Sequence, residues 1–162
     1  MTRGRPSSTE FVRSVLVAAA EQSLPRQADA LARADELLQR FELAAHAQRK
    51  VAELPGGVRK LLDIAMALTR QPRVLILDEP TSGVSADEKF PMMETVMRAL
   101  SHEAVTVLFV EHDMDIVERF SDRVAAFYSG RIIADGHVEE VLADADVQRH
   151  VTGHRLKGVA DA

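Results

Sequence analysis

The sequence predicts an α/β fold in which a helical part precedes a parallel sheet, and three observations support this prediction. Apolar side chains recur at helical spacing through residues 1–70. Two short, continuous apolar runs follow, Val74–Leu77 and Val105–Val110, with a helical pattern between them. Each run ends in polar side chains, and strands that alternate with helices are typical of a parallel sheet.

Composition excludes several classes of protein. The 162 residues suffice for one domain or for part of a larger one, at roughly 100–200 residues per domain. Cysteine is absent, which excludes disulfides, thiolate metal sites and a catalytic thiol. No apolar run approaches the ~18–20 residues that span a bilayer. With 20 basic and 25 acidic side chains the formal net charge is −5, which disfavours nucleic acid as a partner.

The first part of the chain predicts three helices. Ser7 and Glu10 have the spacing of a capping box, which predicts a helix over about 8–22. Apolar residues every three or four positions predict an amphipathic helix over 28–41. A third helix is expected over about 57–71, after a loop that contains two glycines.

The two apolar runs predict neighbouring strands buried on both faces, with a helix over about 86–101 between them. Later elements are a helix over 115–120, a hairpin that turns at Ser129-Gly130, and two short helices. The residues after Gly153 are expected to be a loose tail.

Polar triplets end both predicted strands: Asp78-Glu79-Pro80 and Glu111-His112-Asp113. Ligands of open α/β sheets bind at the carboxyl ends of the strands. One carboxylate there can hold Mg²⁺, a second can deprotonate an attacking water, and a histidine can donate to a phosphate oxygen. These residue types in this order favour hydrolysis of a nucleoside triphosphate.

Each motif also has a purely structural interpretation. Two acids after an apolar strand are common in proteins. Asp113 has the position and chemistry of a helix N-cap. The Leu54–Gly57 segment can be a simple turn between helices.

Together these residues resemble the ATP-binding subunit of ABC transporters, from about Thr9 to Gly153. The segment 74–83 is similar to the Walker B strand and the start of the D-loop. Leu54–Lys60 lies where that family has its signature loop, and Val110–Asp113 is similar to the switch histidine motif. The residues after the signature and in the D-loop resemble importers of branched-chain and other hydrophobic amino acids.

The resemblance implies a role for each matching residue. Asp78 would help to hold Mg²⁺, Glu79 would be the general base for the attacking water, and His112 would contact the γ-phosphate of ATP. Gly56 and Gly57 would bring backbone N–H groups against the γ-phosphate of ATP bound to a partner subunit, at the positive end of a helix.

Three positions depart from the family pattern. Pro55 replaces the signature serine and offers neither a hydroxyl nor an N–H group. Val58 replaces the glutamine that usually follows the second glycine, and Ser85 stands where the D-loop often has aspartate. Pro55 and Ser85 still belong to the set of positions that the resemblance assigns to nucleotide binding.

No Gly-x-x-x-x-Gly-Lys-Ser/Thr string occurs in the 162 residues, and no strand is predicted before residue 8. The expected fold is therefore an incomplete P-loop NTPase fold of the ABC ATPase type. Residues 1–53 would form the helical subdomain, 54–153 the signature loop, Walker B strand and switch region, and 154–162 the tail. We expect such a chain to be a truncated subunit that binds ATP weakly or not at all.

The resemblance further implies transmembrane permease subunits and a second ATP-binding subunit, in a homo- or heterodimer, as partners. It implies a cytoplasmic location at the inner face of the cell membrane. The alternative is a non-enzymatic module that binds a membrane subunit or a complete ATPase. A DNA-repair or chromosome-organising ATPase is disfavoured because the chain lacks a basic surface and a long heptad segment. The sequence leaves the transported solute open.

Overall fold

The computed structural model describes residues 11–153, which divide between Val110 and Glu111 into two compact units. We call residues 11–110 unit 1 and residues 111–153 unit 2. The predicted capping box and tail lie outside the described residues. The predicted subdomain boundary after residue 53 stays a prediction. None of the described helices is both long enough and apolar enough to span a bilayer.

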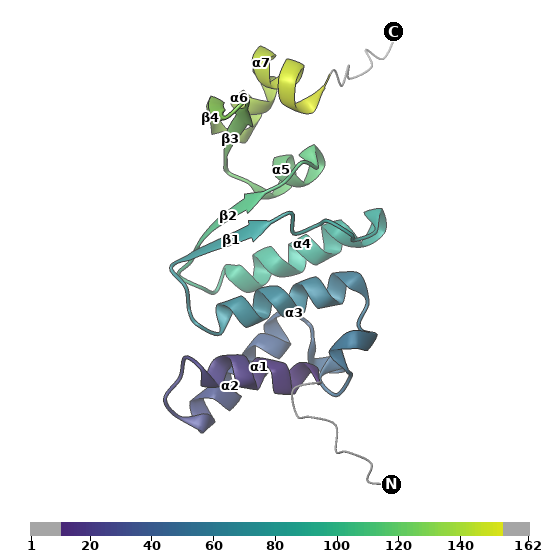
Figure 1. Ribbon diagram of the computed structural model, residues 1–162, viewed down its shortest axis with the longest axis vertical. Helices are drawn as coiled ribbons and strands as arrows, with labels where there is room; N and C mark the ends of the chain where they lie inside the picture. Colours follow the sequence, from purple (N-terminus) through teal and green to yellow (C-terminus); the bar gives the residue numbers. More distant parts are fainter. Residues whose placement is uncertain (1–10, 154–162) are drawn as a thin grey trace. The chain divides into compact units, whose positions relative to one another are not determined.

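Unit 1 begins with a helical hairpin, drawn in purple and blue in Figure 1. Arg13 on the first helix and Asp35 on the second form a bidentate ion pair, with N–O distances of 2.8 and 2.9 Å. The hydrogen bonds from Arg13 lower the pKa of the Asp35 carboxyl. The helical elements of this part are α1 (Val12–Glu21), α2 (Gln27–Arg40) and the 3-10 turns η2 (Ala44–His46) and η3 (Val51–Glu53).

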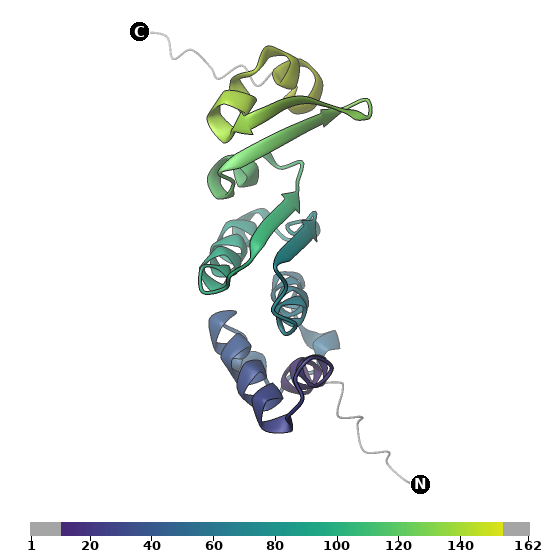
Figure 2. The same ribbon diagram turned by 90° about the vertical axis from the view of Figure 1, so that its left-hand side faces the viewer.

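A two-stranded parallel sheet and two further helices complete unit 1. Both helices lie on the same side of the sheet (Figures 1 and 2). Apolar side chains of the strand β1 and of all four α-helices form one buried core. The predicted strands and helices are thus confirmed as α3 (Gly56–Leu68), β1 (Val74–Asp78), α4 (Ala86–Leu100) and β2 (Thr106–Val110).

The sheet is buried on one face only. Leu75 and Leu77 point into the core, whereas Val74 and Ile76 on β1 are 58% and 64% exposed. On β2, Leu108 and Val110 are 55% and 54% exposed. We call these four side chains the open face. The prediction that both faces are buried is therefore wrong for unit 1, because its helices cover only the opposite face.

The open face predicts self-association of the chain, because four apolar side chains in adjacent strands lose contact with water when two copies meet. Light scattering on the purified chain should show an average mass that rises with concentration. The double variant Ile76→Lys with Leu108→Glu should stay monomeric. The control Gln39→Lys with Gln48→Glu adds the same charges at exposed polar positions and should associate like the wild type. A constant monomer mass for the wild type would contradict the prediction.

Four charged side chains, Arg33, Glu36, Arg40 and Glu103, form a closed ring of ion pairs that we call the ion cluster. Arg33 donates to Glu103 at 2.8 Å, to Glu36 at 2.8 Å and to the carbonyl of Leu68 at 3.0 Å. Burial works to lower the pKa of Arg33, but the hydrogen bonds to the two glutamates raise it above its usual value. The cluster connects α2 to the end of α3, through the carbonyl of Leu68, and to the loop before β2, through Glu103.

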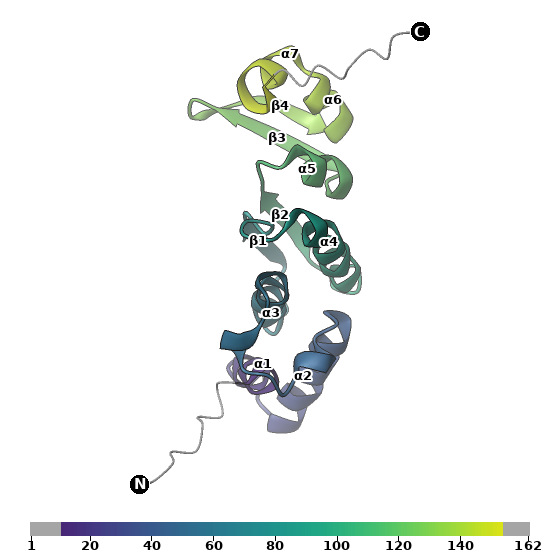
Figure 3. The same ribbon diagram turned by 90° about the vertical axis from the view of Figure 1, so that its right-hand side faces the viewer.

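Unit 2 is built on an antiparallel hairpin, which Figure 3 shows beside its short helices. Ser129 and Gly130 turn the hairpin with φ angles of 49° and 76°, as the sequence predicts. Val141 and Val147 pack with Ala126 in a small apolar core. The elements of unit 2 are α5 (Met114–Phe120), β3 (Arg123–Tyr128), β4 (Arg131–His137), α6 (Val138–Ala143), α7 (Ala145–Val147) and η4 (Gln148–Thr152).

Candidate functional site

The two carboxylates of the predicted site lie at the carboxyl end of β1. Asp78 is the last residue of the strand and pairs in register with Val110 of β2. The N–H of Glu79 donates to the carbonyl of Val110 at 2.9 Å, which holds the end of β1 against the end of β2. Both acidic residues are exposed. The edge of the sheet therefore presents adjacent carboxylates to the outside of unit 1.

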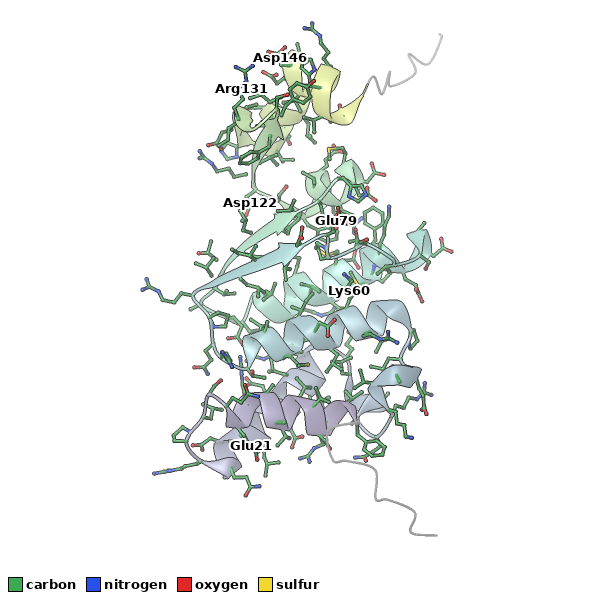
Figure 4. All side chains as sticks on the ribbon, in the orientation of Figure 1. Glu21, Lys60, Glu79, Asp122, Arg131 and Asp146 are labelled. Carbon is green, nitrogen blue, oxygen red and sulfur yellow. The ribbon has the colours of Figure 1, made fainter. Side chains whose placement is uncertain are left out.

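The backbone of Glu79 adopts an uncommon conformation. Its φ angle is +44°, in the left-handed region that residues with a Cβ rarely enter. Such a residue costs about 1 kcal/mol or more and persists when its surroundings fix it. Its carbonyl oxygen accepts from the N–H of Ser82 at 3.0 Å and from Nζ of Lys60 at 3.5 Å. Figure 4 labels Lys60 on α3 and Glu79 at the end of β1.

The signature positions form the beginning of α3. Pro55 is the N-cap residue and makes no side-chain hydrogen bond to the first turn. The first N–H groups of a helix have no partner within the helix, and in α3 the Pro55 side chain does not supply one. A Cβ at Gly56 would lie 3.4 Å from the carbonyl oxygen of Gly83, and one at Gly57 would lie 3.7 Å from Val84. These are ordinary contacts, so packing within unit 1 does not require glycine at either position.

The turn after Glu79 brings the D-loop against the signature loop. Gly83 has a φ angle of +76°, a conformation that favours glycine. Ser85 is the N-cap residue of α4, and its hydroxyl donates to Oε2 of Glu88 at 3.0 Å. Unit 1 thus contains the two strand-end acids, the start of α3 and the turn between β1 and α4, and this turn contacts α3 at Gly56.

His112 belongs to unit 2 and lies in the segment before α5. Its backbone N–H donates to Oε2 of Glu111 at 3.3 Å. The carboxylate of Asp113 accepts from the N–H of Asp115 at 3.1 Å and caps α5, so the structural interpretation of Asp113 is confirmed. The convergence of His112 with Asp78 and Glu79 stays a prediction.

The carboxylates at the end of β1 are of the chemical type that magnesium prefers. In the described residues no group of three His, Cys, Asp or Glu side chains is placed to hold a metal by itself. Mg²⁺ is usually bound by one or two carboxylates together with water and substrate phosphates. The exposed carboxylate of Asp78 at the end of β1 has the chemistry of such a ligand.

The contact of Lys60 with the backbone of Glu79 was not indicated by the sequence. Lys60 occurs in the signature segment, but no local pattern indicates that its ammonium reaches the carbonyl of residue 79, which lies 19 positions later. An alternation of charged and apolar residues on α3 is equally typical of a solvated helix face.

Comparison with known proteins agrees with these motifs. The family model for the ABC transporter matches residues 6–82. The branched-chain amino acid transport ATP-binding protein LivG of Salmonella typhimurium is 36% identical over 127 residues, which are 78% of this chain and 50% of LivG. The methionine import ATP-binding protein MetN of Caulobacter vibrioides is 38% identical over 115 residues, covering 71% of this chain and 35% of MetN.

A solved structure has the same fold. The protein cbiO1 of Clostridium perfringens, part of the ABC transporter complex cbiONQ, superimposes with a TM-score of 0.77 and 28% identity. The match covers 86% of this chain and 56% of that one. The chain thus spans about half the length of the LivG and cbiO1 proteins that it matches, and its fold is part of the P-loop NTPase fold of ABC ATPases. The chain thus contains the ABC transporter domain match over residues 6–82 and is a partial homologue of ABC transporter ATP-binding proteins.

Proposed function

We propose that this chain supplies the Walker B acids, the signature loop and the switch histidine of the ATP-hydrolysing subunit of an ABC importer. The strongest support is the position of Asp78 and Glu79 at the carboxyl end of β1, where the turn that follows them packs against the start of α3. MgATP is the substrate. The two carboxylates, the start of α3 and the D-loop are all contributed by unit 1.

Each residue then has a role that its chemistry allows. The Asp78 carboxylate binds the magnesium of MgATP, and Glu79 accepts a proton from the attacking water. His112 donates to the γ-phosphate, whose equatorial oxygens carry negative charge in the transition state. Pro55, Gly56, Gly57 and Ser85 face the ATP of a second ATP-binding subunit, and the uncapped N–H groups of α3 suit a phosphate there.

The substrate class of the transporter follows from similarity alone. The match to LivG supports import of branched-chain or other hydrophobic amino acids, while MetN is named for import of methionine. Transmembrane permease subunits would select the solute, and this chain would lie against them at the inner face of the membrane.

The chain by itself should bind ATP weakly, because the 162 residues contain no P-loop string to hold the phosphates. The test is a hybrid chain, in which a segment with the Gly-x-x-x-x-Gly-Lys-Ser/Thr string of a family member precedes this sequence. The hybrid should bind and hydrolyse MgATP, and substitution of the P-loop lysine should remove both. A hybrid that folds and binds ATP without any hydrolysis would contradict the proposal.

A non-enzymatic interaction module is the second candidate, and Pro55 is the observation that favours it. Proline at the N-cap of α3 removes both the hydroxyl and the N–H that a serine would offer to a phosphate. In this case an inactive hybrid would accompany saturable binding of the 162-residue chain to a complete ABC ATPase. Isothermal titration calorimetry measures that binding directly.

A further inference from the structure

Lys60 is the charged group of α3 that reaches the backbone of the candidate base. Its Nζ lies 3.5 Å from the carbonyl oxygen of Glu79, on the side of β1 that faces α3. The same oxygen accepts from the N–H of Ser82 at 3.0 Å, so both of its lone pairs have a donor. The N–H of Glu79 is held by Val110 at 2.9 Å. The peptide groups on both sides of this residue are therefore fixed by hydrogen bonds.

These bonds act on a residue whose conformation needs support. Glu79 is not a glycine, yet its φ angle is +44°. A residue in this region relaxes to negative φ unless its neighbours hold it, and relaxation would turn the direction of its side chain. The ammonium adds a charge–dipole attraction to the carbonyl, over an Nζ–O distance of 3.5 Å that is longer than the ~2.7–2.9 Å of a strong charge-assisted hydrogen bond.

Lys60 also lies one helical turn after Gly56, at the spacing that places both on one side of α3. A helix moves as a rigid element, so a shift of its first turn also shifts the Lys60 side chain. The Lys60 side chain thereby links the start of α3 to Glu79 directly. This link is in addition to the contact of Gly56 with Gly83 in the turn that follows Glu79.

We propose that Lys60 is a positioning residue, which fixes the left-handed backbone of Glu79 through its carbonyl and couples the orientation of this carboxylate to the start of α3. The proposal rests on the proposed function, in which Glu79 is the general base. Lys60 itself touches neither the water nor the phosphate in this assignment.

The first test uses the 162-residue chain without nucleotide. In the Lys60→Met variant, NMR should show faster solvent exchange of the Ser82 amide, by about fivefold, because the shared carbonyl becomes mobile. The one-bond coupling constant between Cα and Hα of Glu79, which distinguishes positive from negative φ, should move towards the value for negative φ. Lys60→Arg should restore both. Arg59→Met is the matched control, since Arg59 donates to the carbonyl of Leu54 at 3.2 Å instead.

The second test measures hydrolysis by the hybrid chain. Lys60→Met should lower kcat about fivefold and leave KM for ATP and the melting temperature unchanged, and Lys60→Arg should recover the rate. Unchanged Glu79 coupling and Ser82 exchange in Lys60→Met would overturn the proposal and leave the proposed function intact. A kcat within twofold of the parent, in a hybrid that Glu79→Gln inactivates, would overturn it as well. If the Glu79→Gln hybrid is active, Glu79 is not the general base, and the proposed function fails together with the role of Lys60.

Discussion

Glu79→Gln should abolish ATP hydrolysis by the hybrid chain and leave its ATP binding intact. The amide has nearly the same shape as the carboxylate, but an NH₂ donor replaces one of the two acceptor oxygens and the group cannot accept the proton of the attacking water. A positioned general base contributes roughly 10²–10⁴-fold to a rate, so the loss should lie in that range. Phosphate release measures the rate, and fluorescence titration with a labelled ATP analogue measures the binding.

The control for this experiment is Glu118→Gln, which makes the same chemical change at an exposed position on α5. It should leave turnover within about twofold of the parent, since it removes no group of the proposed site. Equal turnover of Glu79→Gln and Glu118→Gln would show that the strand-end acid is not the base. The carboxylate of Asp78 would then have to be tested in that role.

Glu103→Gln should destabilise unit 1 by about 3 kcal/mol, because it removes the negative charge that Arg33 and Arg40 share in the ion cluster. Glu103 is 12% exposed and accepts from both Arg33 and Arg40 through one oxygen, and Arg33 is only 7% exposed. The neutral amide would leave two guanidinium groups facing each other with only Glu36 between them. Urea unfolding followed by circular dichroism measures the free energy of unfolding.

The matched control is Glu42→Gln, which breaks the ion pair of Glu42 with Arg98. Both side chains of that pair are well exposed, at 64% and 58%, so its loss should cost less than about 1 kcal/mol. If the two variants have the same free energy of unfolding, the cluster contributes no more than an ordinary surface pair.

Much of the fold is predictable from local pattern. Apolar periodicity gives the helices, and the apolar run from residue 74 gives β1, because both signals depend on neighbouring residues in the sequence. The burial of β1 was not predictable in the same way. A continuous apolar run indicates that a strand can be buried on both faces, but which faces are covered depends on elements elsewhere in the chain. Val74 and Ile76 are exposed because the helices of unit 1 pack on the opposite face.

The candidate site likewise has features that local sequence predicts and features that depend on tertiary packing. The placement of Asp78 and Glu79 at a strand end follows from their position after the apolar run. The left-handed φ of Glu79 and its contact with Lys60 do not, because they arise from tertiary packing between α3 and the end of β1. Arg33 and Glu103 are likewise unremarkable in sequence, and only the fold brings them together across 70 residues.

The ion cluster also affects the order in which the chain acquires its structure during synthesis. At about 5–20 residues per second, a ribosome adds Glu103 roughly 4–14 s after Arg33. The helices α1 and α2 can pair within that interval because their contacts are close in sequence. The guanidinium of Arg33 nevertheless stays in water until its second carboxylate arrives. On a ribosome stalled before residue 103, α1 and α2 would therefore already be paired. The guanidinium of Arg33, which is buried in the finished fold, would still be hydrated.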